Sequence, residues 1–290
     1  MQWHPDNGPA INLLDPSADG VMLVQDGVRG LSMPPVQRYT STSPAVHGSR
    51  NRGHRVEERE VFWPLLVWTR DGTDAWMRLD SRLWDGLRPD VEGWWVVETA
   101  WSGRRRLRCR FADDGDHSFG RDPSRSGWAL YGVRLVAEQP FWTSESTPIE
   151  WDQGAPDAFF PGPPFRISGS RRMDTATLRN PGDVHAWPVW TINGPCSSAT
   201  VGVGGRQVVV PFAVASGERL VIDTRPEHMT ATLVTAAGAE VDRTADLGAA
   251  TEFAPVPAGG TVDLSLTAPG GGRVTADMTA LYYRAWGPRD

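Results

Sequence analysis

The chain has no lysine, and all 29 of its basic residues are arginines. This absence excludes Schiff-base chemistry and a Walker-type phosphate loop, because both depend on a lysine amine. The chain has only two cysteines, Cys109 and Cys196, and neither belongs to a CxxC pair. Two isolated cysteines do not make a disulfide framework, so we expect both to be small buried apolar side chains in a reducing compartment.

Long apolar runs and an excess of positive charge are also missing. No stretch of about 18 apolar residues occurs, as a membrane span would need, and residues 1–20 lack the pattern of a signal peptide. The net charge is −6, with 18 arginines against 20 acidic residues in 1–147 and 11 against 15 in 148–290. Neither half supplies the positive field that binds nucleic acid. We therefore expect no membrane and no nucleic acid as partners, and a protein made in the cytoplasm.

Motifs of catalysis are absent as well. The sequence holds no GxSxG, HExxH, Walker A or GxGxxG motif, and its six histidines form no HxH or HxxxH pair. These absences predict no enzyme, no cofactor and no metal site. The glycine-rich segment 201–207 predicts a hairpin turn, because no helix follows it to hold a phosphate. A glycosidase pair is defined by distance in space, so a cell-wall hydrolase stays open as a hypothesis.

Glycine and proline are abundant, with 31 and 24 residues. In the second half they separate strand-sized pieces about every ten residues, a spacing typical of β-sandwiches and jelly rolls. The Ser/Thr/Pro-containing segment 143–150 indicates a linker. We therefore predict two domains, 1–147 and 148–290, in an all-β fold with one main helix.

Apolar residues recur at helical spacing in one segment of the first domain: Trp76, Leu79, Leu83, Trp84 and Leu87. Thr73 is the expected N-cap, and Pro89 ends the run. Strands are predicted at 11–14 and 20–31, which would pair with each other, and at 55–68, 94–101, 102–111 and 127–142. The polar segment 47–54 predicts a solvated or partner-facing loop. Most of the 14 tryptophans, Trp101 among them, are expected in the core or within strands.

Segment 102–111 alternates in polarity. Leu107, Cys109 and Phe111 face one side, and three arginines, which we call the arginine ladder, face the other: Arg106, Arg108 and Arg110. The ladder is either a solvated strand face or a row of guanidiniums that docks on carboxylates of a neighbouring subunit. Arginine suits the second task because its planar fork pairs bidentately with carboxylates. The candidate counterpart is an acidic run: Glu57, Glu58 and Glu60.

Several segments along the chain are distinctive as a set. RLVAEQPFW closes the first domain with Pro140, Phe141 and Trp142. The second domain contains FRIS, TLRNPGDVHAWPVWTINGP and GERLVIDT, with Asn180, Gly182, Asp183 and Pro188. Together these segments resemble the distal tail protein family of long-tailed phages, the siphovirus-type tail component or minor tail protein, in the versions of actinobacterial phages. The resemblance covers nearly the whole chain, and the absence of lysine fits such GC-rich hosts.

The resemblance implies an architecture and a place. The first domain would be a β-barrel-like fold with one helix and a projecting hairpin, and six copies would close into a ring. The second would be a sandwich of galectin-like or carbohydrate-module-like type. The ring would sit at the virion tail tip, after assembly in the host cytoplasm, and join the tail tube protein to the baseplate hub or tail-associated protein.

A ring needs two unlike patches on each subunit. The candidates are the hairpin at 40–60, with Arg50, Arg52, Arg55 and the acidic run, and the arginine ladder. Two other hypotheses stay open: a carbohydrate-binding adhesin that binds host-surface glycans through exposed tryptophans of the second domain, and the hydrolase.

The block 180–195 carries structural expectations. Asn180–Asp183 predicts a tight turn, in which Gly or Asn lowers the cost of a positive φ. Pro188 has no N–H, so it belongs at the start of a strand or at a sheet edge. Trp187 and Trp190 differ in parity along the strand, so one is expected in the core and the other outside it.

Overall fold

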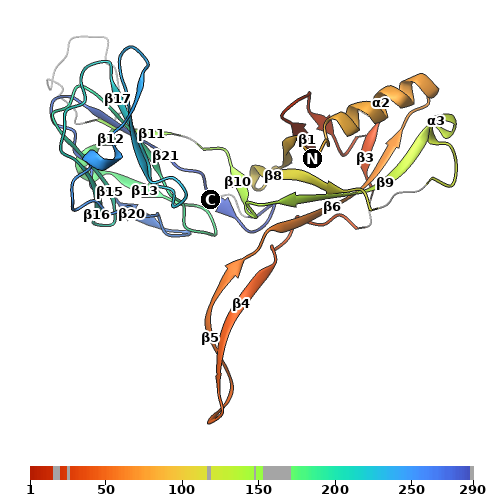
Figure 1. Ribbon diagram of the computed structural model, residues 1–290, viewed down its shortest axis with the longest axis horizontal. Coiled ribbons are helices and arrows are strands. Elements are labelled where there is room, and N and C mark those ends of the chain that lie inside the picture. Colours follow the sequence, from red (N-terminus) through yellow and green to blue (C-terminus); the bar gives the residue numbers. More distant parts are fainter. Residues whose placement is uncertain (16–19, 25–26, 116–118, 147, 153–170, 288–290) are drawn as a thin grey trace. The chain divides into compact units, whose positions relative to one another are not determined.

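The computed structural model describes residues 1–15, 20–24, 27–115, 119–146, 148–152 and 171–287. They form two compact units (Figure 1). Unit 1 comprises Met1–Ser144 together with the chain from Tyr282 on, and unit 2 comprises Glu145–Leu281. Strands make up most of the regular structure, with one long helix in unit 1, which confirms the predicted all-β class.

Unit 1 is built on one sheet. Its strands are β1 (Gln2–Pro5), β2 (Ile11–Asn12), β3 (Val21–Leu23), β6 (Arg59–Trp68), β7 (Glu92–Thr99), β8 (Gly103–Asp113), β9 (Trp128–Ala137), β10 (Trp142–Ser144) and β22 (Leu281–Tyr282). They follow the order β2-β1-β7-β8-β9-β6-β3, with β10 paired to β8 and β22. The edge strands approach each other where the Leu23 N–H donates to the Leu13 carbonyl oxygen at 2.9 Å. The sheet is therefore a nearly closed barrel, as the resemblance implies.

Two details of the sheet differ from the sequence predictions. The segments 11–14 and 20–31 do not pair as strands with each other, because β2 pairs with β1 and β3 pairs with β6. Trp101 lies in the turn after β7 and is 61% exposed. The alternation of β8 is confirmed, with Leu107 and Cys109 buried and the arginine ladder on the opposite side.

Four neighbouring indole rings fill the barrel, all of them fully buried: Trp3, Trp63, Trp95 and Trp142. Neighbouring ring centroids lie 5.3, 5.4 and 5.1 Å apart, in edge-on or tilted arrangements. Aromatic pairs in such geometry add to the free energy of burial. This row of rings accounts for four of the ten tryptophans in the first half of the chain.

The predicted helix is α2 (Thr73–Asp85), which lies over the sheet of unit 1 (Figure 1). Trp76 and Leu83 are buried against the sheet side, and the Trp84 ring lies 5.1 Å from that of Tyr131 on β9. The predicted N-cap is wrong by one residue. Gly72 occupies the cap and Thr73 is the first helical residue, with no side-chain capping hydrogen bond. A short helix, α3 (Pro123–Ser126), precedes β9.

Between β3 and β6 the chain forms a long hairpin, which we call the arm: β4 (Val36–Ser43) paired with β5 (Val46–Val56). The loop predicted at 47–54 is wrong, since this segment is most of β5. Nearly every residue of the arm is exposed. Its sequence lacks the apolar alternation of a half-buried strand because neither of its faces is buried. In Figure 1 the arm stands away from the sheet of its unit.

Unit 2 is the predicted β-sandwich. Its strands are β11 (Ile149–Asp152), β12 (Arg171–Arg172), β13 (Thr177–Arg179), β14 (Val189–Asn193), β15 (Ala199–Val203), β16 (Arg206–Val210), β17 (Arg219–Asp223), β18 (Thr230–Val234), β19 (Glu240–Asp242), β20 (Thr261–Asp263) and β21 (Arg273–Asp277), with 3₁₀ turns at Met173–Thr175 and Thr244–Asp246. One layer is a sheet in the order β12-β11-β21-β14-β17-β18-β19. The pairs β13-β20 and β15-β16 form the other layer. Residues from both layers share one core, Trp190 and Val201 among them. Gly204 and Gly205 make the predicted hairpin turn.

The turn at 180–183 is present, for a different reason than predicted. The buried Asn180 amide donates to the carbonyl oxygens of Val184 and Val256 at 2.8 and 3.1 Å, and its Oδ1 accepts from the Gly182 N–H at 2.9 Å. Gly182 does not have a positive φ, so that expectation is wrong. Glycine is needed because a Cβ here would lie 2.7 Å from the carbonyl oxygen of Leu281.

The rest of this block follows the sequence expectations. The Asp183 N–H donates to the Leu281 carbonyl oxygen at 2.8 Å. Pro188 is buried directly before β14, at the start of a strand, and its carbonyl oxygen accepts from Thr224 at 2.6 Å. Trp190 lies in the core at 1% exposure, and Trp187 is half-buried. The FRIS segment lies outside the described residues.

A buried arginine ties the end of the chain to unit 1. Arg59 is 1% exposed. Its guanidinium donates at 2.7 Å to the carbonyl oxygens of Pro140, Gly30 and Tyr283. Among the described residues no carboxylate pairs with this charge, and its hydrogen bonds all go to backbone carbonyl oxygens. Burial lowers the pKa of Arg59 to about 10.

A second arginine holds the same segment. Arg105 is 4% exposed; its Nη1 donates to the Arg284 carbonyl oxygen at 2.9 Å, and its guanidinium lies 3.6 Å from the ring centroid of Tyr282. The sequence boundary at residue 147, which lies outside the described residues, assigned everything after it to the second domain. The chain instead returns to unit 1 at Tyr282, because two buried guanidiniums require its carbonyl oxygens.

Candidate functional site

Two of the ladder arginines, Arg108 and Arg110, form hydrogen bonds with carboxylates of unit 1. Arg108 donates to Glu92 Oε2 and to Asp6 Oδ1, both at 2.8 Å. Arg110 donates to the other oxygen of Glu92. The hydrogen bonds from Arg108 lower the pKa of Asp6, and those from Arg110 and Arg108 lower the pKa of Glu92. The ladder thus pairs with carboxylates of β7 and of the residue after β1, and makes no contact with the acidic run 57–60.

Arg106 has a different environment. Its guanidinium lies 4.4 Å from the ring centroid of Trp94, and that of Arg108 lies 5.2 Å from the same ring. Stacking on an indole face stabilises a guanidinium without a carboxylate. All three ladder arginines therefore make contacts inside unit 1.

The arm carries positive charge alone. Residues 36–56 contain four arginines, two histidines and no acidic residue, in a chain whose net charge is −6. Arg52 donates to the Ser41 hydroxyl at 2.9 Å. Within the described part of the chain, Arg38, Arg50 and Arg55 have no hydrogen-bonding or ion-pair partner for their side chains. The arm is therefore an exposed hairpin whose positive charge no carboxylate among the described residues neutralises.

The acidic run lies where the arm joins β6. Glu58 and Glu60 are exposed and Glu57 is half-buried. Among the described residues none of the three carboxylates has an ion-pair partner. Glu58 and Glu60 line a groove of about 430 Å³ together with Phe62 and two arginines, Arg29 and Arg134. The structure therefore places the predicted arginines 50, 52 and 55 on β5, and the acidic run on the link after it and the start of β6.

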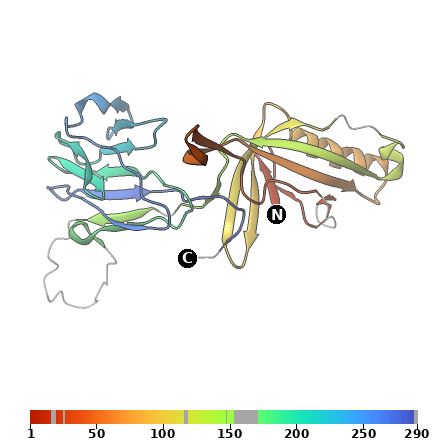
Figure 2. The ribbon, with the colours of Figure 1, turned by 90° about the horizontal axis from the view of Figure 1, so that it is seen from below.

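Sequence reasoning missed an apolar surface, which we call the outer face: the side of β6 and β9 that points away from the barrel interior. Its apolar members are Phe62, Leu66, Trp68, Trp128 and Leu130. Trp128 and Leu130 are 48% and 46% exposed. Figure 2 looks onto β6 and β9 with α2 behind them. The run VFWPLLVW, apolar at both parities, is the signal that could have predicted this surface.

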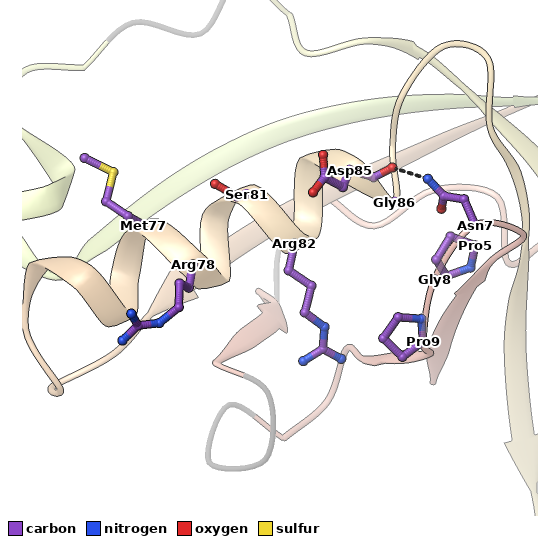
Figure 3. A pocket seen from close by; sticks show the side chains of 10 residues that line it. All are labelled: Pro5, Asn7, Gly8, Pro9, Met77, Arg78, Ser81, Arg82, Asp85 and Gly86. Atoms are coloured by element: carbon purple, nitrogen blue, oxygen red, sulfur yellow. Dashed lines mark hydrogen bonds between the residues drawn. The ribbon is translucent and has the colours of Figure 1, made fainter.

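A second depression lies beside α2. It has a volume of about 440 Å³ and is lined by Pro5, Pro9, Met77 and Arg82, among others (Figure 3). The Asn7 amide donates to the Asp85 carbonyl oxygen at 2.8 Å and closes one end. Its lining also includes Ser81 and Asp85, one turn apart on α2.

The described residues also bear on metal binding, thiol reactivity and membrane insertion. They contain no group of three or more His, Cys, Asp or Glu side chains that could hold a metal ion. Cys109 is fully buried in the barrel, and burial raises the pKa of its thiol well above the ordinary value, so it is not a nucleophile. No helix in the described ranges has the length and apolar character that a bilayer crossing requires.

Similar proteins are found among solved structures and not by sequence. No protein-family model matches the sequence, and no curated protein matches it. Among solved structures, the chain is similar to the Dit protein of phage SPP1, described as a paradigm of the hub adsorption apparatus in phages that infect Gram-positive bacteria. The TM-score is 0.63 at 12% identity, over 96% of this chain and 98% of that one. The chain has the fold of a phage distal tail protein.

The same fold occurs in larger assemblies. The chain is similar to a component of the phage P2 baseplate in its activated conformation with calcium, with a TM-score of 0.51 at 10% identity over 95% of this chain and 97% of that one. The strontium form of that baseplate gives the same values. Because both coverages are nearly complete, the distal tail fold accounts for unit 1 and unit 2 alike.

Proposed function

We propose that this chain is a structural protein of a phage tail tip, in which six copies form a ring that joins the tail tube to the baseplate hub. The observation that carries the proposal is the likeness of nearly the whole chain, barrel and sandwich together, to a distal tail protein and to a baseplate component.

The charge distribution supports ring formation in particular. A cyclic ring joins two unlike patches, one on each side of every subunit. The arm supplies a basic patch in which Arg38, Arg50 and Arg55 lack partners among the described residues, and the acidic run supplies carboxylates that lack ion-pair partners there. The arginine ladder has a smaller part in this interface, because Asp6 and Glu92 already neutralise Arg108.

The partners follow from the same proposal. The ring contacts the tail tube protein on one side and the hub or tail-associated protein on the other, within a virion assembled in host cytoplasm. The rival hypothesis, a glycan-binding adhesin, has less support. The strongly exposed large apolar residues in the described part of unit 2 are Met229 and Val241, neither of which offers an aromatic platform for a sugar.

Light scattering on the purified chain at micromolar concentration tests the proposal. We expect a particle of six times the 31.8 kDa chain mass, and a ring in negative-stain images. A strict monomer with saturable binding of host wall glycans, detected by quenching of tryptophan fluorescence, would contradict the ring and favour the adhesin.

A further inference from the structure

The tripeptide Asn-Gly-Pro occurs twice in the chain, at 7–9 and at 193–195, and these are the only two Asn-Gly pairs in the sequence. An asparagine followed by glycine is prone to spontaneous deamidation. The glycine has no side chain to hinder its backbone nitrogen as that nitrogen attacks the asparagine amide carbon. Because the three residues are the same at both places, a difference in their reactivity must come from the surrounding structure.

The first tripeptide lies in an open turn between β1 and β2. Asn7 and Gly8 are both exposed, and Asn7 lines two surface depressions. Within the described part of the chain the Gly8 N–H makes no hydrogen bond. A Cβ added to Gly8 would meet nothing nearer than Pro5, at 3.8 Å. The backbone of this turn therefore has room to rotate, and the Gly8 nitrogen is available to react.

The second tripeptide is held inside the sandwich. Asn193 is the last residue of β14 and pairs with β17 on one side and β21 on the other. The Gly194 N–H donates to the Glu218 carbonyl oxygen at 3.1 Å. A Cβ on Gly194 would lie 2.1 Å from the Ala215 carbonyl oxygen. Attack on the amide carbon needs the asparagine ψ to leave the extended range of a strand, and these pairings and contacts oppose that rotation.

We propose that Asn7 is a site of spontaneous deamidation in the folded protein and that Asn193 is protected from it. The Gly8 nitrogen bonds to Cγ of Asn7, the bond from Cγ to Nδ2 breaks, and the amide proton of Gly8 leaves with Nδ2 as ammonia by way of solvent. The product is a five-membered succinimide. Water then opens the ring at either carbonyl and leaves aspartate or isoaspartate. This inference does not depend on the proposed ring of six subunits.

The reaction removes a tie between the turn and α2. The Asn7 amide donates to the Asp85 carbonyl oxygen at 2.8 Å (Figure 3), and Asp85 is the last residue of α2. A carboxylate has no N–H to donate, and its negative charge is unfavourable beside the carbonyl oxygens of a helix C-terminus. Deamidation therefore releases the turn from the helix and opens one end of the depression beside α2.

Peptide mapping of the full chain tests the reactivity. Because the chain has no lysine, trypsin cleaves it only after arginine and gives peptide 1–29 with Asn7 and peptide 180–206 with Asn193. Mass spectrometry of both peptides follows incubation of the folded chain in mildly alkaline buffer, and tandem fragmentation assigns the altered residue. A sample digested without incubation corrects for deamidation during digestion.

We expect Asn7 to react at least about tenfold faster than Asn193 in the folded chain. Opening a strand of the sandwich costs more than the about 1.4 kcal/mol to which a factor of ten corresponds. In urea strong enough to unfold the chain, the two asparagines should react at similar rates. Equal rates in the folded chain would overturn the inference.

Gly8→Ala is the matched variant for the chemistry. The added methyl group has room in the turn, so the hydrogen bond of Asn7 is kept, while the methyl group hinders attack by the backbone nitrogen. We expect the deamidation of Asn7 to be lost over the same incubation. A rate that Gly8→Ala leaves unchanged would show that the Gly8 nitrogen is not the attacking group, and the proposal would fail.

Asn7→Asp tests the consequence, because it reproduces the charge of one product. We expect hydrogen exchange to lose protection in the last turn of α2. The control is Asn51→Asp, which adds the same charge at an exposed position where Oδ1 already accepts from the Gly53 N–H at 3.2 Å, a role that a carboxylate keeps. It should leave α2 unchanged. Unaltered protection of α2 in Asn7→Asp would refute the release of the turn from the helix.

Discussion

Arg108 joins carboxylates from two parts of the barrel, and its partners explain why the ladder is not simply a solvated face. Sequence analysis identified the alternation of β8 correctly, because polarity with a period of two is a local signal. It did not identify Asp6 as a partner, since that residue lies 102 positions away and only the pairing of β1, β7 and β8 brings it close. Contacts of this kind depend on register, which the sequence leaves open.

The pH dependence of unit 1 should follow from this pairing. The pKa values of Asp6 and Glu92 are lowered in the folded state, so their stabilising contribution is complete above the ordinary values, about 4, and is lost as the pH falls through the folded ones. In urea titrations followed by tryptophan fluorescence, Arg108→Gln should lower the midpoint at neutral pH and approach the unaltered chain below about pH 3.

The matched control for this experiment is Arg134→Gln. Arg134 lies 3.3 Å from Asp113, but both side chains are about half exposed or more, and exposed pairs contribute little. We expect no comparable change in midpoint at any pH. A difference between Arg108→Gln and the unaltered chain that stays constant from neutral to acidic pH would contradict the assignment to these two carboxylates.

At the scale of elements, sequence analysis predicted the helix and strands that bury apolar residues on one side. α2 and the strands of the barrel carry clear apolar periods, and the structure confirms them. The resemblance implied the hairpin at 40–60, but the residue pattern alone predicted a loop at 47–54, because strands that are stabilised by pairing and not by a buried face have no period to detect. The outer face was missed for the opposite reason. Apolar residues at both parities were assigned to the core, and no residue pattern distinguishes a buried apolar face from an exposed one.

The turn at 180–183 offers a test at the same scale. Gly182→Ala places a methyl group 2.7 Å from the Leu281 carbonyl oxygen, a backbone atom that cannot rotate away, so we expect unit 2 to lose about 2 kcal/mol of stability. Gly260→Ala is the control in the same unit, because its added methyl group would meet the nearest atom, the Pro257 carbonyl oxygen, at an ordinary 3.5 Å. Equal urea midpoints for the two variants would refute the steric explanation.

At the scale of the whole molecule, unit 1 is made from two separate stretches of chain, and composition could not reveal this. The linker signal at 143–150 was found because it is local. The return at Tyr282 has no such signal, since its partners Arg59 and Arg105 are distant in sequence and look like ordinary surface arginines. A buried arginine becomes recognisable only when the carbonyl oxygens around it are known.

Truncation tests the return. A chain that ends at Leu281 deprives Arg59 and Arg105 of the Tyr283 and Arg284 carbonyl oxygens, and unpaired buried guanidiniums are strongly destabilising. We expect hydrogen exchange to lose protection in the strands of unit 1 and to keep it in the sandwich. A chain that ends at Gly287 is the control and should match the unaltered protein. Equal loss in both units would contradict the division of the chain.

The return at Tyr282 also fixes an order of events during synthesis. A ribosome reaches the last strand of the barrel only after it has made all of Glu145–Leu281. The sandwich is therefore fully translated before the carbonyl oxygens of Tyr283 and Arg284 exist to accept from Arg59 and Arg105, and the barrel is completed last.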